Sequence, residues 1–128
     1  MDILAALYID NLELRPVDGG ATHIDITGIK FSGAAPEPVP FTWTPHMVVL
    51  VRCPPDESGT GALEVVFRMD GDEVARNAQP LQVEPGKFAY RLVQAELEFA
   101  GYDTVEAHCR IDMGPVTVVP FTMLEPAD

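Results

Sequence analysis

The chain has 128 residues, of which 47% are hydrophobic and 22% charged, which is typical of one globular domain spanning residues 1–128. Twenty acidic and eight basic side chains give a formal net charge of −12. Because this charge repels the phosphates of nucleic acids and of anionic membranes, we expect no nucleic acid and no membrane as partner. Twelve prolines and ten glycines indicate many turns and therefore short strands.

Two strands are expected in the first quarter of the chain, the first of them with a continuation. The apolar run Ile3–Ile9 predicts a first strand, and Leu12–Val17 predicts its continuation. Asp18-Gly19-Gly20 is a turn signal, after which Thr22–Phe31 predicts the next strand. Gly28 interrupts the alternation of polar and apolar residues there, which indicates a bulge.

The middle of the chain contrasts a proline-rich stretch with an apolar strand. Ser32–Pro45 predicts a loop or a polyproline-like edge, because proline lacks the N–H that a strand ladder needs. Met47–Cys53 is almost continuously apolar, which predicts a central strand covered on both faces. Ser32–Pro45, a partner strand or another subunit could provide the outer cover.

A hairpin and an edge are expected in the third quarter. Asp70-Gly71 is a strong hairpin signal between strands at Ala62–Met69 and Asp72–Ala78. Pro80–Pro85 predicts a short edge strand. In the next segment, Phe88, Tyr90 and Leu92 occupy one face, whereas Val93, Ala95, Leu97 and Phe99 alternate in the other register. This change predicts a bulge or break near Val93, with a helical turn at Gln94–Leu97 as the alternative.

The C-terminal residues predict an antiparallel hairpin. Val105–Ile111 alternates apolar with polar residues, Asp112–Gly114 forms a turn, and Val116–Leu124 follows as a second strand. The pattern over the whole chain predicts an all-β fold, an immunoglobulin-like antiparallel β-sandwich of about seven to nine strands.

The chain resembles a family of bacterial single-domain β-sandwich proteins to which no activity is assigned. The likeness rests on Asp18-Gly19-Gly20 leading to Ile26-Thr27-Gly28, on the strands around Asp70-Gly71, and on Gly101-Tyr102 with Pro120-Phe121. It covers most of the chain, and it implies a sandwich fold but no functional residue.

Cys53 and Cys109 are spaced like the inter-sheet disulfide of immunoglobulin domains. However, no Trp follows Cys53 at the expected place, and Ala107 stands where the immunoglobulin pattern has Tyr. The N-terminus also carries Asp2 where a secretory signal needs positive charge. We therefore expect two reduced thiols and a cytoplasmic protein.

No residue pattern points to catalysis or to a bound cofactor. His23 and Asp25 share a strand face and could form a base with its orienting carboxylate, although an ordinary polar pair has the same pattern. Asp70, Asp72 and Glu73 could hold calcium, although hairpin turns favour such residues for backbone reasons. We therefore expect no catalytic residue, no metal and no cofactor.

The best candidate interaction surface is formed by Phe41, Trp43 and Pro45, since Trp is frequent at energetically important interface positions. Alternatively, these side chains plug one end of the sandwich. The sequence thus predicts a non-catalytic interaction or structural module with an unknown protein partner and a possible homodimeric state. A protein that binds a small ligand or a metal at the open end of the sandwich is the alternative.

Overall fold

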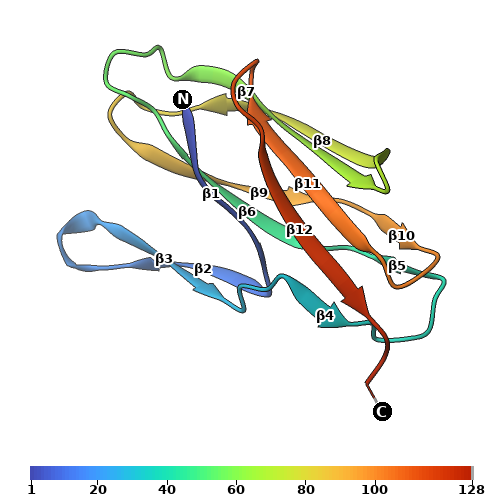
Figure 1. Ribbon diagram of the computed structural model, residues 1–128. Helices are drawn as coiled ribbons and strands as arrows, with labels where there is room; N and C mark the ends of the chain where they lie inside the picture. Colours follow the sequence, from blue (N-terminus) through green and yellow to red (C-terminus); the bar gives the residue numbers. More distant parts are fainter. Residues whose placement is uncertain (128) are drawn as a thin grey trace.

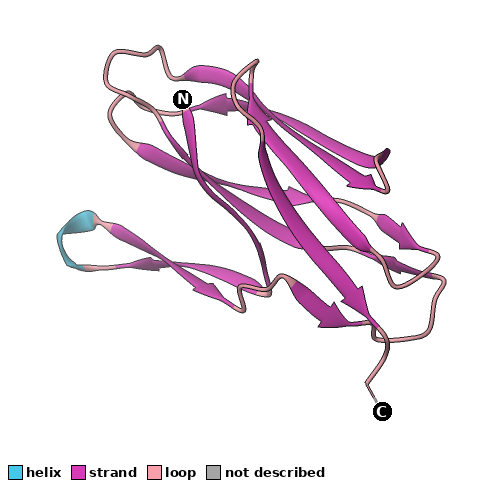
Figure 2. Cartoon of the chain, viewed as in Figure 1, coloured by secondary structure: helices cyan, strands magenta, loops and turns pink. Residues whose placement is uncertain are grey.

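The computed structural model describes residues 1–127, which form twelve strands and no α-helix. Within this range no helix has the length and apolar character needed to cross a membrane. The all-β prediction is thereby confirmed, and the sheets are arranged in a way consistent with a β-sandwich (Figures 1 and 2).

The strands, in chain order, are β1 (Asp2–Ile9), β2 (Asn11–Pro16), β3 (Thr22–Thr27), β4 (Ser32–Ala34), β5 (Phe41–Trp43), β6 (His46–Arg52), β7 (Thr60–Met69), β8 (Asp72–Gln82), β9 (Phe88–Gln94), β10 (Leu97–Phe99), β11 (Thr104–Ile111) and β12 (Thr117–Leu124). A short 3₁₀ turn at Asp18–Gly20 joins β2 to β3.

Two sheets enclose the core. One has the order β1-β6-β9, and the other has the order β4-β12-β11-β7-β8. All pairs in them are antiparallel except β12 with β4, which is parallel. Two smaller pairs complete the chain: β5 with β10, and β2 with β3. The β2–β3 hairpin extends away from the main body of the molecule (Figure 1).

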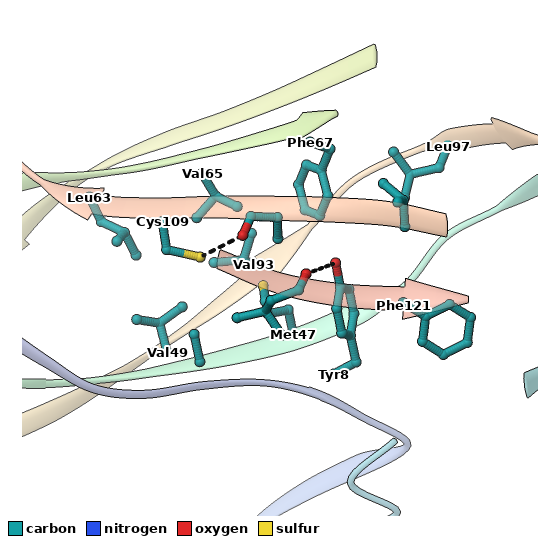
Figure 3. Packing of buried hydrophobic residues seen from close by; sticks show 14 of the residues in the cluster. Tyr8, Met47, Val49, Leu63, Val65, Phe67, Val93, Leu97, Cys109 and Phe121 are labelled. Atoms are coloured by element: carbon teal, nitrogen blue, oxygen red, sulfur yellow. Dashed lines mark hydrogen bonds between the residues drawn. The ribbon is translucent and has the colours of Figure 1, made fainter. Parts of the chain in front are cut away.

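The core lies between the inner faces of the two sheets. Met47 and Val49 from β6 meet Val65 and Phe67 from β7 in one cluster of buried residues (Figure 3). The sheets are also tied by a buried hydrogen bond, in which the Tyr8 hydroxyl donates to the Val119 carbonyl over 3.2 Å.

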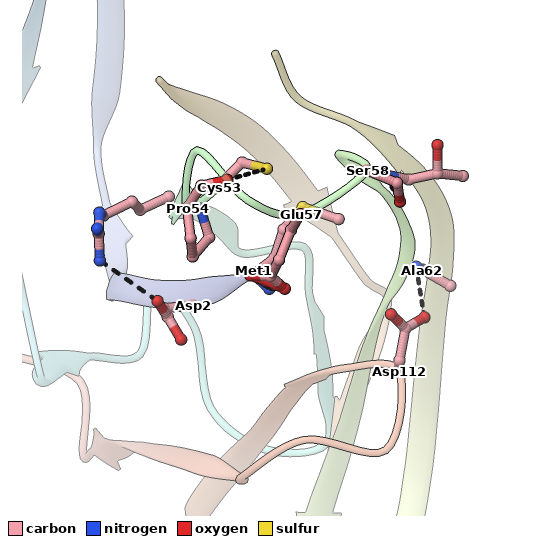
Figure 4. Close-up of polar contacts among 10 residues, drawn as sticks. Met1, Asp2, Cys53, Pro54, Glu57, Ser58, Ala62 and Asp112 are labelled. Carbon is pink, nitrogen blue, oxygen red and sulfur yellow. Dashed lines mark hydrogen bonds and ion pairs between the residues drawn. The ribbon is translucent and has the colours of Figure 1, made fainter. Parts of the chain in front are cut away.

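One end of the molecule is held by polar contacts between loops and strand ends. The amide of Ala62 donates to the Asp112 carboxylate over 2.9 Å, which fixes the turn between β11 and β12 against β7 (Figure 4). At the same end, Asp2 pairs with Arg52 of the neighbouring strand over 3.6 Å.

Two turn signals act as the sequence predicts. Asp70 and Gly71 have φ angles of 50° and 82°, the positive pair that a two-residue hairpin turn requires. The hairpin at the C-terminus is also confirmed, with β11 and β12 paired through Cys109 and Thr117 next to the turn.

Three predicted segments were wrong in detail. The strand expected at Thr22–Phe31 ends at Thr27, because Gly28 takes a φ of 72° and leaves the ladder. Ser32–Pro45, expected to be a loop or a polyproline-like edge, contains two short strands: β4, which is an edge strand of the five-stranded sheet, and β5. The strands expected on either side of Gln79 are one strand, β8, which tolerates Pro80 because β8 is an edge strand.

The break expected near Val93 lies two residues beyond it, at Ala95–Glu96, whereas no bulge or register change occurs at Val93 itself. Val93 lies inside β9 and is fully buried, and β9 continues to Gln94. The expected helical turn at Gln94–Leu97 is also absent, since Ala95 and Glu96 form an irregular link to β10. The pattern has a simpler cause: β9 carries apolar side chains on both of its faces.

Candidate functional site

The apolar side chains on the second face of β9 belong to an exposed surface of the β1-β6-β9 sheet. The register sets Leu50 opposite Tyr90 and Arg52 opposite Phe88, pointing away from the core residues Val49 and Val51. We call this surface the outer apolar face, and its members are Leu4, Leu50, Phe88, Tyr90 and Leu92.

Phe88 is the centre of the outer apolar face. It is 58% exposed, so its large apolar ring is available for contact. Three cavities share it: one of about 460 Å³ with Leu50, one of about 450 Å³ with Leu4, and one of about 530 Å³ with Tyr90 and Leu92. The surface around Phe88 is therefore apolar and hollowed.

The β2–β3 hairpin adds a second apolar surface. Its register sets Leu12 opposite Ile26 and Leu14 opposite Ile24, so these four side chains share one face. Ile24 and Ile26 line the cavity of about 460 Å³ together with Leu50 and Phe88. The cavity thus lies between the hairpin and the outer apolar face.

The hairpin faces the outer side of β6 across the cavity, beside Leu50. Val48 points outward, opposite Leu7 and Leu92, and yet is fully buried. The cover expected from Ser32–Pro45 does not lie on this side, because β4 pairs with β12 in the other sheet. The sequence prediction of a two-faced apolar strand at Met47–Cys53 agrees with β6 over Met47–Val51.

Charges around the outer apolar face occur as ion pairs. Arg52 pairs with Asp2, and Lys87 pairs with Glu84 over 3.1 Å. On the polar face of the hairpin, Arg15 donates to Asp25 over 2.8 Å. The rim of the face is therefore balanced in charge.

The free edge of β9 is closed by side chains. Asn77 of β8 donates to the Gln94 carbonyl over 3.1 Å, and Gln79 donates to the Leu92 carbonyl over 3.2 Å. The Tyr90 carbonyl accepts from the Arg91 guanidinium over 2.8 Å. These contacts protect the edge against pairing with another strand, so that the face of this sheet, rather than the edge, is open.

The predicted interaction surface lies largely in the core. Phe41 and Pro45 are buried, and Trp43 is half-buried with its ring centroid 4.2 Å from that of Phe121. Phe41 stacks on Phe99 at 6.0 Å. This is the packing role that the sequence left open as the alternative, and these three residues offer little free surface.

The structure brings His23 and Asp25 together, but with Arg15 between them. Arg15 Nη2 lies 3.3 Å from His23 Nδ1, and the same guanidinium binds both Asp25 oxygens. The hydrogen bond from Arg15 lowers the pKa of Asp25. Because that carboxylate is held by Arg15, it does not orient His23 as a catalytic base.

The other candidate groups are accounted for by packing and pairing. No group of three metal-ligating side chains occurs within residues 1–127, and Glu73 is bound by Arg76 over 2.7 Å. Cys53 and Cys109 are buried free thiols, in agreement with the expected reduced state. Burial raises the pKa of Cys109 to about 12, so this thiol is not a nucleophile at neutral pH.

A second hollow of about 300 Å³ lies on the outer side of the five-stranded sheet. It is crossed by ion pairs, since Glu64 binds Arg76 over 2.7 Å and lies 3.7 Å from Arg110. Val118 of β12 is an exposed apolar residue on this side of the sheet, at 44%. Because Glu64 already pairs with both arginines, we do not regard this hollow as a candidate binding site.

No family model, no curated protein and no solved structure matches this chain in comparisons with known proteins. The resemblance to bacterial β-sandwich proteins stays a prediction.

The sequence contained a signal for the outer apolar face that our interpretation did not use. Phe88, Tyr90 and Leu92 alternate with Val93 and its neighbours, and the two sets were assigned to two registers of one face. A strand with two apolar faces in a two-layer protein must expose one of them or cover it. The alternation was therefore a signal from which this surface could have been found.

Proposed function

We propose that this chain is a non-catalytic protein-interaction module of immunoglobulin-like type that binds a partner through the outer apolar face. The observation that supports this proposal is the exposed position of Phe88 between three apolar hollows. Single exposed apolar residues are common on protein surfaces, whereas a contiguous set is typical of contact sites.

The energetics favour a macromolecular partner. Fully burying one large apolar side chain contributes about 1.5–3 kcal/mol. Leu4 and Leu92 are also about half exposed, at 55% and 46%, so a partner that covers all three side chains gains several such contributions. The ion pairs at the rim can orient the bound partner. Their desolvation costs little free energy, because each charge already has its counter-ion.

A small apolar ligand is the second candidate, and one observation favours it. The cavity between Ile26 and Phe88 measures about 460 Å³, within the range of about 300–1,000 Å³ that small-molecule sites have. The position differs from the open end of the sandwich that the sequence suggested, since Phe41 and Trp43 fill that end.

Selection of peptides from a random display library on the immobilised protein tests the interaction proposal. We expect enriched peptides with alternating apolar residues whose affinity falls at least about tenfold, or ~1.4 kcal/mol, in Phe88→Asp. Phe88 is exposed, so this substitution leaves the core intact. Val118→Asp, on the other sheet, is the matched control and should bind like the unmodified protein.

Two results would contradict the proposal. One is the absence of any enriched peptide, and the other is binding that survives Phe88→Asp unchanged. Displacement of a fluorescent apolar dye from the unmodified protein, without peptide binding, would instead favour the small-ligand alternative.

A further inference from the structure

The β3 strand presents a free backbone edge next to the outer apolar face. The Val17 amide donates to the Ala21 carbonyl over 3.0 Å, which identifies this pair as hydrogen-bonded. Hydrogen-bonded pairs recur at every second residue of an antiparallel ladder, so His23 and Asp25 point their backbone groups at β2.

The alternate residues of β3 point their backbone groups the other way. These are Thr22, Ile24 and Ile26, and within residues 1–127 no other residue hydrogen-bonds their N–H or carbonyl groups. The same residues line the cavity beside Leu50 and Phe88. The cavity is therefore bounded by an unpaired strand edge and an apolar sheet face.

Three other strand edges carry protective features that β3 lacks. The β9 edge is capped by Asn77 and Gln79. The outward edge of β2 includes Pro16, which has no N–H to donate, and the β8 edge includes Pro80. A regular edge of unprotected strand is a template for pairing with another strand.

The geometry points to a second copy of this chain as the occupant: β3 of one protomer pairs antiparallel with β3 of its partner, around a two-fold axis at Ile24. This inference rests on the proposed function, since it names the partner of that surface. Its main argument is that β3 is complementary to itself.

One register gives favourable side-chain pairs across the two-fold axis on both the polar and the apolar face of β3. With the axis at Ile24, His23 lies opposite the partner's Asp25, and Thr22 lies opposite the partner's Ile26. Ile24 then faces its own copy in a hydrogen-bonded pair. An axis at Asp25 would set two carboxylates opposite each other, and an axis between two residues would set polar side chains against apolar ones.

Packing and charge agree with this arrangement. A strand added to the β3 edge occupies the cavity of about 460 Å³ and covers Phe88 and Leu50. Three ion pairs lie nearby, Arg15–Asp25, Arg52–Asp2 and Lys87–Glu84, whereas Glu13, opposite Asp25 in the hairpin, has no basic partner within residues 1–127. Most of the net charge of −12 therefore comes from residues outside these pairs, and the paired charges do not oppose self-association through this face.

Site-specific cross-linking tests the register. In Ile24→Cys the two introduced thiols lie across a hydrogen-bonded pair, where Cα atoms are about 5.5 Å apart and a disulfide fits. Mild oxidation should therefore convert Ile24→Cys into a covalent dimer. Ile26→Cys is the control. Its two copies are offset along the paired strands by four residues, roughly 13 Å, so oxidation should form no covalent dimer.

Sedimentation equilibrium tests the association without oxidation. We expect a concentration-dependent dimer that Thr22→Pro weakens at least tenfold, because proline removes an edge N–H. Thr22→Ala keeps that N–H and should associate normally. Ala21 already has the extended backbone, φ −81° and ψ 163°, that a residue before proline requires.

Charge exchange gives a second, independent variant. His23→Asp alone sets a carboxylate opposite the partner's Asp25 and should weaken the dimer. His23→Asp combined with Asp25→His again sets an imidazole opposite a carboxylate and should restore the association. Arg15 lies opposite position 23, so the exchanged carboxylate stays within its reach.

A monomeric mass at all concentrations, or equal cross-linking by Ile24→Cys and Ile26→Cys, would overturn the two-fold pairing. Such results would leave the proposed function intact if selected peptides still bind in a Phe88-dependent manner. Loss of peptide selection together with an intact β3-mediated dimer would instead assign the face to self-assembly alone.

Discussion

Tyr8 shows how a single residue links the two layers. Its ring packs against Trp43 and Phe121, at centroid distances of 5.9 and 5.5 Å, and its hydroxyl reaches the Val119 carbonyl of the opposite sheet. The side chain therefore combines a large apolar contact with a satisfied polar group, as buried tyrosines usually do.

Tyr8→Phe should lower the free energy of unfolding by about 0.5–1.5 kcal/mol, because it removes one buried hydrogen bond and keeps the ring. Urea unfolding followed by fluorescence measures the change. Tyr102→Phe is the control, since its hydroxyl makes no hydrogen bond within residues 1–127 and its loss should be close to neutral. An equal effect of both substitutions would contradict the role given to the Val119 contact.

Cys109 should make stability depend on alkaline pH. Burial raises the pKa of this thiol from 9.0 to about 12, so between these values the unfolded chain ionises while the folded chain stays protonated. Ionisation then stabilises the unfolded state, and the free energy of unfolding falls as the pH rises, at most by ~1.4 kcal/mol per unit.

Urea unfolding across this range, for the unmodified protein and for Cys109→Ala, isolates the contribution of the thiol. The variant should be less stable at neutral pH because of the cavity, but it should have the shallower pH slope. Burial also raises the pKa of Tyr8, so that a residual slope in the variant is expected. Identical slopes would show that Cys109 does not titrate in this way.

At the scale of elements, the positions of the strands were easier to predict than which of their faces are buried. Alternation predicts β11 and β12 correctly because each has one buried and one exposed face, and Asp70-Gly71 marks its turn through backbone geometry. β9 was misread because it is apolar on both faces, which local pattern cannot distinguish from a shift in register.

The position of the candidate site required tertiary information. The sequence shows that Ile24 and Ile26 share a face, but only the fold sets that face beside Leu50 and Phe88. Trp43 was assigned to a contact surface because Trp is frequent at interface positions, whereas the pairing of β5 with β10 packs it, half-buried, against the core. Long-range contacts of this kind leave no local signal.

The capping of β9 by β8 predicts a specific defect. Gln79→Ala should expose the Leu92 carbonyl, cost about 1 kcal/mol and increase aggregation through the uncovered edge. Urea unfolding and light scattering at high protein concentration measure the two effects. Gln82→Ala, on the same strand but without a hydrogen bond to β9 within residues 1–127, should behave like the unmodified protein.

The hairpin has its own hinge at Gly28. A Cβ at this position would collide with the Asp10 carboxylate, and its φ of +72° is costly for other residues. Gly28→Ala should therefore loosen the hairpin, with faster hydrogen exchange of the β3 amides that face β2 and unchanged exchange in β7.

Gly19→Ala is the matched substitution for this experiment. Gly19 has a comparable φ of +86°, but an added Cβ meets nothing within 4 Å. It should accelerate exchange less than Gly28→Ala does. Equal acceleration would mean that backbone strain, and not the contact with Asp10, sets the stability of the hairpin base.

At the scale of the whole molecule, charge opposes self-association while the outer apolar face favours it. Two chains of −12 repel each other at a distance, although the ion pairs near the contact surface do not oppose the association. Salt screens charges separated by more than a Debye length, about 10 Å at 0.1 M and ~3 Å at 1 M, but leaves apolar burial intact.

Raising the salt concentration should therefore strengthen the dimer. We expect the dissociation constant measured by sedimentation to fall several-fold from about 0.01 M to about 0.5 M sodium chloride, because the repulsion between the acidic surfaces is screened. Phe88→Asp should remain monomeric at every concentration of salt, since screening does not replace the lost apolar contact. An association that weakens with salt would mean that attraction between opposite charges drives it, and the assignment of the outer apolar face as the contact surface would then be wrong.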